Sequence, residues 1–105
     1  MKAFLLLIFM LPAFAWADGD EILITLKNHR FEPTQVTAPA GQKLKLRIEN
    51  KDATPEEFES DSMGREKVVP GNGSAILFVG PLTAGKYSFY GDYHEKTAQG
   101  VLIAK

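Results

Sequence analysis

The sequence predicts an all-β protein, built as a sandwich or barrel of short strands. The clearest strand covers residues 43–49, where Leu44, Leu46 and Ile48 alternate with charged side chains. This period-two pattern is typical of a strand with one buried face and one face in water. Turns rich in glycine and proline recur along the chain, and no segment shows helical periodicity over three turns. These observations favour an antiparallel sandwich or barrel over an arrangement of alternating helices and strands.

Further runs rich in β-branched and aromatic residues have the length of strands. They are residues 21–26, 35–37, 75–79, 86–90 and 101–104. Turn sequences such as Pro39-Ala40-Gly41 and Pro70-Gly71-Asn72-Gly73 separate them. Two stretches fit no plain strand: residues 50–69, which are dense in acidic side chains, and residues 91–99, which contain His94. Because binding residues collect on loops presented by a rigid sheet, these two stretches are the predicted functional loops.

The first seventeen residues have the features of a secretory signal peptide. Lys2 precedes an apolar run from Ala3 to Leu11, and the triplet Ala15-Trp16-Ala17 supplies the small residues of a cleavage site. The apolar run is too short to span a bilayer. We therefore expect cleavage after Ala17, so that residues 1–17 are removed and residues 18–105 form a single exported domain.

The composition excludes several classes of site. The 105 residues include no cysteine, which rules out disulfides, thiol catalysis and zinc–cysteine sites. A formal net charge of -1 gives no indication of nucleic-acid binding. No Ser-His-Asp order, phosphate loop or pair of catalytic acids stands out. After residue 17 Met63 is the sole thioether, so any sulfur ligand has to be Met63.

The C-terminal part of the chain resembles the end of a plastocyanin-like cupredoxin. The run Tyr87-Ser88-Phe89-Tyr90-Gly91-Asp92-Tyr93-His94, followed by Gln99-Gly100-Val101-Leu102, matches the last two strands and the ligand loop of that family in spacing. In that family a cysteine closes the penultimate strand and a histidine follows three positions later. Gly91 stands at the cysteine position and His94 at the histidine position. The resemblance implies a cupredoxin-like Greek-key β-sandwich without a type 1 blue-copper site.

The middle of the chain extends the resemblance to a subgroup linked to iron uptake. Glu56 or Glu57 stands where cupredoxins carry their first histidine, depending on a one-residue shift in alignment. Glu57-Phe58-Glu59 and residues 65–71 resemble motifs of the cupredoxin domain of EfeO-type iron-uptake proteins and of small periplasmic cupredoxins that accompany Ftr-type iron permeases. Members of the EfeO branch can carry cysteines, where this chain has Phe31 and Gly91. The resemblance implies a periplasmic protein that binds copper and/or iron, with an Ftr-type iron permease or associated components as partner.

The residue types at these positions describe a harder metal site than a thiolate with two imidazoles. Carboxylates, one imidazole and one thioether suit Cu(II), Fe(II) or Fe(III) better than rapid electron transfer. We predict that the metal ligands come from one set of residues in the two functional loops. The set is His94, Glu56, Glu57, Glu59, Met63 and Asp92.

Phe58 divides the acidic residues of this set. If Phe58 faces the core, Glu56 shares its face while Glu57 and Glu59 face the other way. One ion cannot then take all three carboxylates, and two separate sites are conceivable. The alternative is a solvated acidic loop that binds no metal.

Other members of the set also have two interpretations. Asp92 either orients His94, binds the ion directly or forms a turn. Met63 either serves as a soft ligand for Cu(I) or fills the core. His29 lies next to Arg30 near the first turn and is interpreted as an exposed residue, not as a ligand.

The predicted function is the binding and handover of metal for iron uptake, or copper-assisted oxidation of Fe(II) alongside a permease. The alternative is a metal-free interaction domain that docks a periplasmic partner through its acidic loop. We expect no self-sufficient catalytic site. At most the domain assists the oxidation of ferrous iron as part of a transport system.

Overall fold

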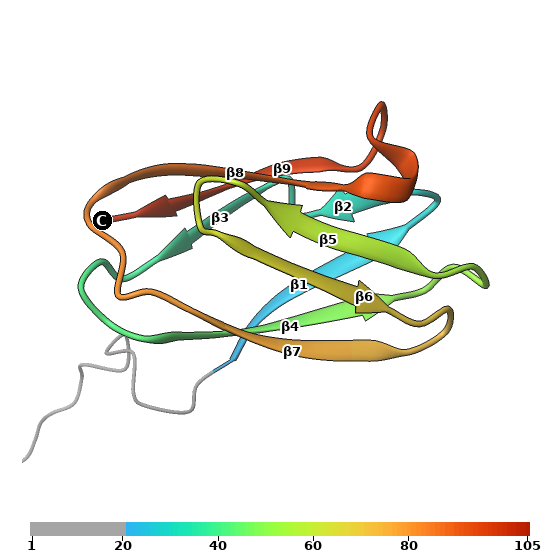
Figure 1. Ribbon diagram of the computed structural model, residues 1–105, viewed down its shortest axis with the longest axis horizontal. Helices are drawn as coiled ribbons and strands as arrows, with labels where there is room; N and C mark the ends of the chain where they lie inside the picture. The colour runs from blue at the N-terminus through green and yellow to red at the C-terminus, as the bar shows by residue number, and fades with distance from the viewer. Residues whose placement is uncertain (1–20) are drawn as a thin grey trace, which may run out of the picture.

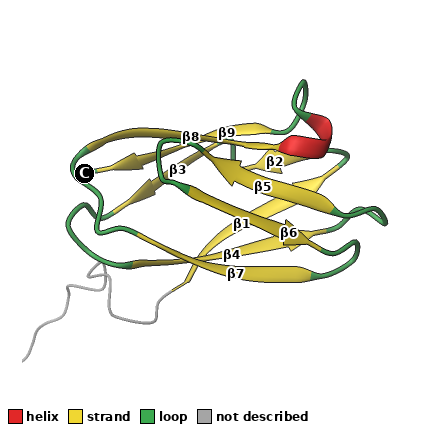
Figure 2. Ribbon diagram, viewed as in Figure 1, coloured by secondary structure: helices red, strands yellow, loops and turns green. Residues whose placement is uncertain are grey.

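The computed structural model describes residues 21–105. The predicted signal peptide at residues 1–17 and its cleavage after Ala17 lie outside these residues, as does the start of the predicted domain. The described chain forms two layers of strands with one turn of 3-10 helix at one end (Figures 1 and 2). Within residues 21–105 no helix has the length and apolar character needed to cross a membrane.

The elements of residues 21–105 follow one another along the chain with short connections. They are β1 (Glu21–Lys27), β2 (Arg30–Glu32), β3 (Gln35–Ala38), β4 (Leu44–Asn50), β5 (Glu56–Ser60), β6 (Arg65–Val69), β7 (Ser74–Val79), β8 (Gly85–Gly91), the 3-10 helix η2 (Asp92–His94) and β9 (Gln99–Ala104). One sheet has the strand order β2-β1-β4-β7, and the other has the order β3-β9-β8-β5-β6.

The two sheets are mixed, whereas the turn-rich sequence favoured a purely antiparallel arrangement. β1 pairs with β4 in parallel, and β3 pairs with β9 in parallel. The remaining neighbours are antiparallel. The prediction of an all-β sandwich is confirmed. Pairing β8 with both β5 and β9 places the start of β5 beside the end of β8, and this end of the sandwich carries η2 (Figure 1).

Residues 50–69 contain two strands, β5 and β6, although no plain strand pattern is present in this part of the sequence. In β5 the side chains of Glu56, Phe58 and Ser60 are buried, while Glu57 and Glu59 are half-exposed. Buried and half-exposed side chains alternate along β5, but acidic residues lie on both of its faces. The sequence therefore shows no alternation of apolar and polar residues, and only Phe58 marks the buried face.

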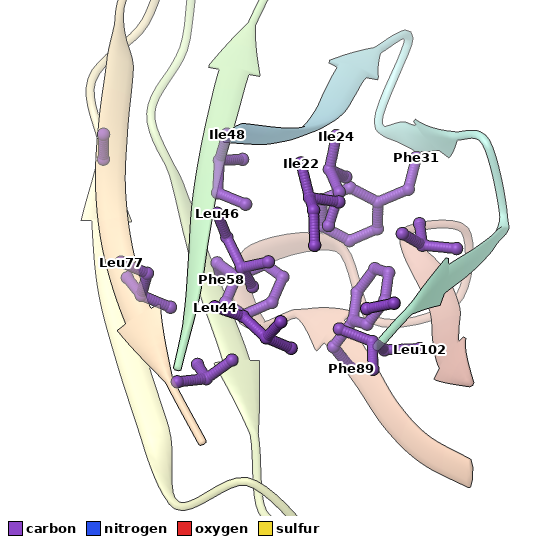
Figure 3. Close-up of a cluster of buried hydrophobic side chains, with 14 of the residues drawn as sticks. Ile22, Ile24, Phe31, Leu44, Leu46, Ile48, Phe58, Leu77, Phe89 and Leu102 are labelled. Carbon is purple, nitrogen blue, oxygen red and sulfur yellow. The ribbon is translucent and has the colours of Figure 1, made fainter. Parts of the chain in front are cut away.

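The core lies between the two sheets and centres on three phenylalanines (Figure 3). The rings of Phe58 and Phe89 stack with centroids 5.1 Å apart, and Phe31 meets Phe89 edge-on at 5.2 Å. Ile24, Leu46 and other aliphatic side chains of the sheet that also carries Phe31 complete the cluster. Burial of Phe58 fixes which face of β5 points inward, and so decides that Glu56 points inward as well.

Candidate metal centre

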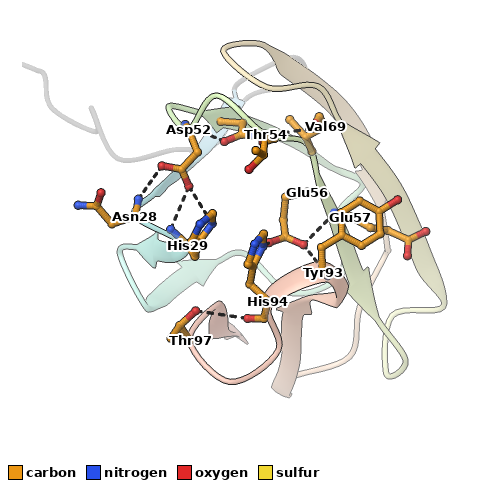
Figure 4. A network of polar contacts seen from close by, with 11 residues as sticks. Asn28, His29, Asp52, Thr54, Glu56, Glu57, Val69, Tyr93, His94 and Thr97 are labelled. Atoms are coloured by element: carbon orange, nitrogen blue, oxygen red, sulfur yellow. Dashed lines mark hydrogen bonds and ion pairs between the residues drawn. The ribbon is translucent and has the colours of Figure 1, made fainter.

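Glu56 and His94 meet although they are far apart in the sequence. Glu56 opens β5, and His94 closes η2, which follows directly on β8. The antiparallel pairing of Phe58 with Gly91 and of Glu59 with Tyr90 brings these two places to the same end of the sandwich. The two predicted functional loops therefore converge, as Figure 4 shows.

The carboxylate of Glu56 is buried, with 1% of the residue exposed. Its Oε1 accepts hydrogen bonds from the backbone N–H of Tyr93 at 2.7 Å and of Glu57 at 3.0 Å. Its Oε2 lies 2.6 Å from Nδ1 of His94. Because an ionised carboxylate only accepts hydrogen bonds, Nδ1 of His94 carries the proton of this contact. Glu56 is thus a buried acid held by two amides and one imidazole, and no Lys or Arg pairs with it among residues 21–105.

His29 approaches the same carboxylate from the turn between β1 and β2. Asn28 and His29 both have positive φ, at 54° and 58°, in the left-handed region that tight hairpin turns require. The carboxylate of Asp52 accepts the backbone N–H of Asn28 at 2.7 Å and that of His29 at 2.9 Å. It also lies 3.4 Å from Nδ1 of His29. Asp52 therefore holds the backbone of the turn in place and lies beside the ring of His29 (Figure 4).

Asp52 keeps its charge through these contacts. Burial alone raises the pKa of its carboxyl group, but the two backbone N–H groups and the imidazoles of His29 and His94 lower it by more. The net pKa lies below its ordinary value.

Asp52→Asn is expected to lower the melting temperature by a few degrees at neutral pH, and the loss should shrink in acid. Because the folded-state pKa is depressed, the charged form contributes stability above the unfolded-state pKa, and this is lost as the pH falls through the folded-state value. Thermal unfolding of both proteins between pH 7 and pH 3 measures the effect. A difference that stays constant over this range would contradict the assignment.

The rings of His29 and His94 stack on each other. Their centroids are 3.6 Å apart, and their planes differ by 12°. Each of His29, Glu56 and His94 offers a ligand atom within 4.8 Å of the other two. We call these three residues the inner centre.

A second group of carboxylates lies on the outer face of the same sheet. Glu57, Glu59 and Asp92 each offer an oxygen within 4.8 Å of the others. Glu66 stands opposite Glu59 on β6. We call these four residues the acidic face. Among residues 21–105 none of them forms an ion pair with a Lys or Arg side chain.

Desolvation and then mutual repulsion raise the pKa values of two residues of the acidic face, Glu57 and Glu59. Desolvation, followed by the charges of Glu66, Glu59 and Asp92, raises the pKa of Glu57. Desolvation also raises the pKa of Glu59, where a hydrogen bond from Tyr90 opposes it and nearby carboxylates add to it. Desolvation, helped by Asp61 and Glu59, raises the pKa of Tyr90 to about 12. The outer face therefore carries a high density of negative charge.

Glu59→Gln is expected to raise the melting temperature at pH 7. A carboxyl group with a raised folded-state pKa contributes stability below its unfolded-state pKa and loses it as the pH rises through the folded-state value. At pH 7 the ionised Glu59 of the wild type is therefore repelled by the neighbouring carboxylates, and the neutral amide of Gln removes this repulsion. The gain should vanish when both proteins are melted near pH 3, and Glu32→Gln, an exposed glutamate elsewhere, should show no gain.

Comparison with known proteins decides the family. A sequence model of the cupredoxin-like domain matches residues 1–104. This chain belongs to the cupredoxin-like domain family. Protein RP394 of Rickettsia prowazekii (strain Madrid E) is 46% identical over 83 residues, which are 79% of this chain and 66% of that protein. The match thus spans just under two thirds of the relative's length.

Solved structures agree on the cupredoxin-like fold. Auracyanin A, a "blue" copper protein from Chloroflexus aurantiacus, has a TM-score of 0.70 at 16% identity, over 82% of this chain and 98% of its own. The metal-binding domain of the Cu(I)-exporting P-type ATPase CopA of Streptococcus pneumoniae has a TM-score of 0.71 at 14% identity, over 87% and 91%. Amicyanin from Paracoccus versutus has a TM-score of 0.63 at 18% identity, over 85% of both chains. At these identities the likeness concerns the fold.

The cupredoxin-like fold separates the predicted ligands into groups. Glu56 and His94 meet at the inner centre, while Glu57, Glu59 and Asp92 meet on the acidic face. The expectation that Phe58 divides the glutamates between two faces is confirmed. Asp92 is exposed and opens η2, and the hydrogen-bond partner of the His94 ring is Glu56.

Met63 lies apart from both groups. It belongs to the turn between β5 and β6, at the other end of β5 from Glu56. The side chain packs against the hydrophobic core, and its backbone N–H donates to Oγ of Ser60 at 3.2 Å. The structure gives Met63 the core-filling role of its two interpretations.

His29 is the residue that the sequence interpretation missed. It is half-exposed and stacked on His94, not a free surface residue. The usable signal was Asn28 directly before it, because Asn at a two-residue turn between β-rich runs indicates a tight hairpin. Such a hairpin presents its tip at one end of the sandwich, and Asp52 in the next predicted loop supplies the partner that holds it.

Proposed function

We propose that this cupredoxin-like domain is a periplasmic metal-binding module that holds a copper ion at the inner centre and handles metal for iron uptake. Glu56 and His94 are the principal ligands, and His29 is the third. Handover to a partner is the proposed mechanism, with copper-assisted oxidation of Fe(II) alongside a permease as its redox form. Iron is the alternative ion for the same ligands.

One observation carries the proposal: a buried carboxylate contacts an imidazole, and among residues 21–105 no Lys or Arg pairs with it. Transferring an ionised carboxylate out of water costs several kcal/mol even after relaxation, so a protein keeps one buried only where something compensates. Two amides and His94 satisfy Glu56 in part. A divalent cation would neutralise the charge directly, and the neighbouring imidazoles supply its other ligands.

The donor set fits the proposed ions. Imidazole nitrogens suit copper, iron, zinc and nickel, and two histidines with one carboxylate also occur as a ligand set for Fe(II). Copper is favoured among these because auracyanin A and the CopA domain, which share the fold, are copper proteins. When bound, the ion would supply Lewis acidity and, for copper or iron, a one-electron redox couple.

The ligands have to rearrange slightly to bind one ion together. For Nδ1 of His94 to bind the ion, the ring would take its other neutral tautomer, with the proton on Nε2 and without net loss of a proton. The lone pairs of the ring nitrogens lie in the ring planes, and these planes are nearly parallel and stacked, so one ring has to turn before both can point at the same ion. We expect His29 to turn, because 41% of its side chain is exposed against 29% for His94.

The acidic face is the proposed place of a second, weaker site for iron. Carboxylate oxygens are hard donors that suit Fe(III) as cargo. Glu57, Glu59 and Asp92 approach closely enough to share one ion. A bound cation would offset the desolvation and the mutual repulsion that raise the pKa values of Glu57 and Glu59.

The link to iron uptake and to an Ftr-type permease rests on sequence resemblance. Glu57-Phe58-Glu59 and residues 65–71 carry it, and in the fold they form the neighbouring strands β5 and β6. The resembling segments therefore supply Glu57, Glu59 and Glu66 of the acidic face. A partner that accepts iron would approach on this side.

The test is a titration of the purified protein with Cu(II) and with Fe(III), followed by electron paramagnetic resonance. One Cu(II) per chain with hyperfine splitting from imidazole nitrogen, lost in His94→Ala, is the expected result. Lys96→Ala, an exposed change two residues away, is the matched control and should bind as wild type does. If neither Cu(II) nor Fe(III) binds specifically, the proposed metal-binding function is wrong.

The second candidate is a metal-free domain that docks a basic partner on the acidic face. The carboxylates there, unpaired with Lys or Arg in the described chain, favour it. Salt weakens such docking because it screens exposed charges, whereas a chelator has no effect. Partner capture from a periplasmic extract in the presence of either reagent separates the two functions.

A further inference from the structure

Residues 56 and 91 compete for one space beside His94. Gly91 ends β8 and is buried. A β-carbon at residue 91 would lie 2.6 Å from Cδ of Glu56 and 2.8 Å from its Oε2. Both distances are far shorter than ordinary contacts, so the Glu56 carboxylate fills the volume that a side chain at residue 91 would need.

The backbone does not require glycine at residue 91. Its φ of -97° and ψ of 114° lie in the extended region that every residue adopts. Its N–H donates to the carbonyl of Ala98 at 2.8 Å, which any residue except proline could do. Glycine is therefore explained by space, which is limited by Glu56 on one side and by the methyl group of Ala98, 2.8 Å from the same β-carbon position, on the other.

We propose that Gly91 is the specificity-determining position of the inner centre, because a side chain at residue 91 and the Glu56 carboxylate exclude each other next to His94. With glycine at residue 91, the centre presents a hard carboxylate oxygen to its ion. A residue with a ligand atom at position 91 would present that atom instead. The consequence for ion choice rests on the proposed function, whereas the exclusion itself is a property of the metal-free protein.

The exclusion is tested without metal by a double-mutant cycle in an Ala98→Gly background, which removes the second obstacle. Gly91→Ala is introduced with Glu56 present and with Glu56→Ala. The folded-to-unfolded ratio from urea unfolding should fall about tenfold more with Glu56 present. Equal losses in the two backgrounds, including a failure of both to fold, would overturn the proposal.

A second measurement reports on the position of Glu56 and not on stability. The short contact between Glu56 and His94 should give a low-field proton resonance from Nδ1–H of His94 in wild type and in Ala98→Gly. Gly91→Ala in the same background should remove it, because the β-carbon displaces the carboxylate. A resonance that persists in a folded Gly91→Ala protein would show that the two groups share the space after all.

The consequence for ion choice is tested by Gly91→Cys combined with Glu56→Ala and Ala98→Gly. Here the ligand atom at residue 91 is a thiolate beside two imidazoles, a set that gives copper its intense visible charge-transfer absorption. Cu(II) should give this band in the triple variant and not in wild type. If the double-mutant cycle shows the expected coupling but the triple variant lacks the absorption band, the claim about ion specificity is refuted. The mutual exclusion of Glu56 and a side chain at residue 91 would still hold. Absence of copper binding in wild type would instead count against the proposed function.

Discussion

Glu56→Gln is expected to lower the affinity for Cu(II) on the order of 100-fold or more. Even partners that only orient a metal ligand are worth about 10–100-fold in affinity, and here the change removes a charged ligand outright. The amide carries no charge to neutralise the ion and binds copper poorly. Competition titration of the purified proteins against a chelator of known affinity measures the loss.

The variant should still fold, which makes the loss of affinity interpretable. The amide oxygen of Gln can accept the N–H groups of Tyr93 and Glu57 as Oε1 of Glu56 does. The amide NH₂ can donate to Nδ1 of His94, which then takes its other neutral tautomer. Removing the buried charge also removes its desolvation cost, so the melting temperature of the metal-free protein should not fall sharply.

Glu57→Gln is the matched control for Glu56→Gln. It deletes the same charge from the adjacent residue, whose side chain lies on the other face of β5. If copper binds at the inner centre, Glu57→Gln leaves its affinity unchanged, while it weakens any binding of Fe(III) at the acidic face. Equal effects of the two changes on copper would contradict the separation of the two sites.

The sequence predicted the fold well where polarity and periodicity agree. In β4 the apolar positions alternate with charged ones, and each apolar position is buried. The strands β5 and β6 were not expected, since glutamate occupies both faces of β5 and residues 65–68 of β6 are exposed. Strand formation there follows from the pairing of β5 with β8 and of β6 with β5, which no local sequence pattern records.

The inner centre could be predicted only in part, for a comparable reason. Glu56 and His94 could be named from their positions in the family pattern, and alternation about Phe58 separated Glu56 from Glu57. His29 could not be assigned in the same way, because its role depends on a hairpin held by Asp52 across 23 residues of sequence. The type of a residue identifies it as a candidate ligand, but only the tertiary structure shows which candidates lie close together.

Phe58→Ala is expected to destabilise the domain by about 3–5 kcal/mol, which is the usual cost of truncating a buried aromatic side chain. Phe58 is fully buried, and its ring stacks on Phe89 and meets Phe31 edge-on at 6.0 Å. The loss combines the transfer free energy of the ring with the cavity left between two sheets that cannot collapse onto it. Urea unfolding followed by circular dichroism measures it.

Phe78→Ala makes the same deletion on the surface and serves as the control. Phe78 on β7 is 45% exposed, and Nζ of Lys43 lies 4.8 Å from its ring centroid. Its loss should cost about 1 kcal/mol or less. Similar losses for the two variants would show that the aromatic cluster is not what holds β5.

Phe58 also links the core to the inner centre, because its burial directs Glu56 inward. A ligand that binds only the folded state adds stability in proportion to the logarithm of its concentration over its dissociation constant. If the centre survives in the Phe58→Ala protein, excess Cu(II) should raise its melting temperature as much as that of wild type. A smaller rise would mean that the packing of Phe58 sets the position of Glu56 as well as the stability of the sandwich.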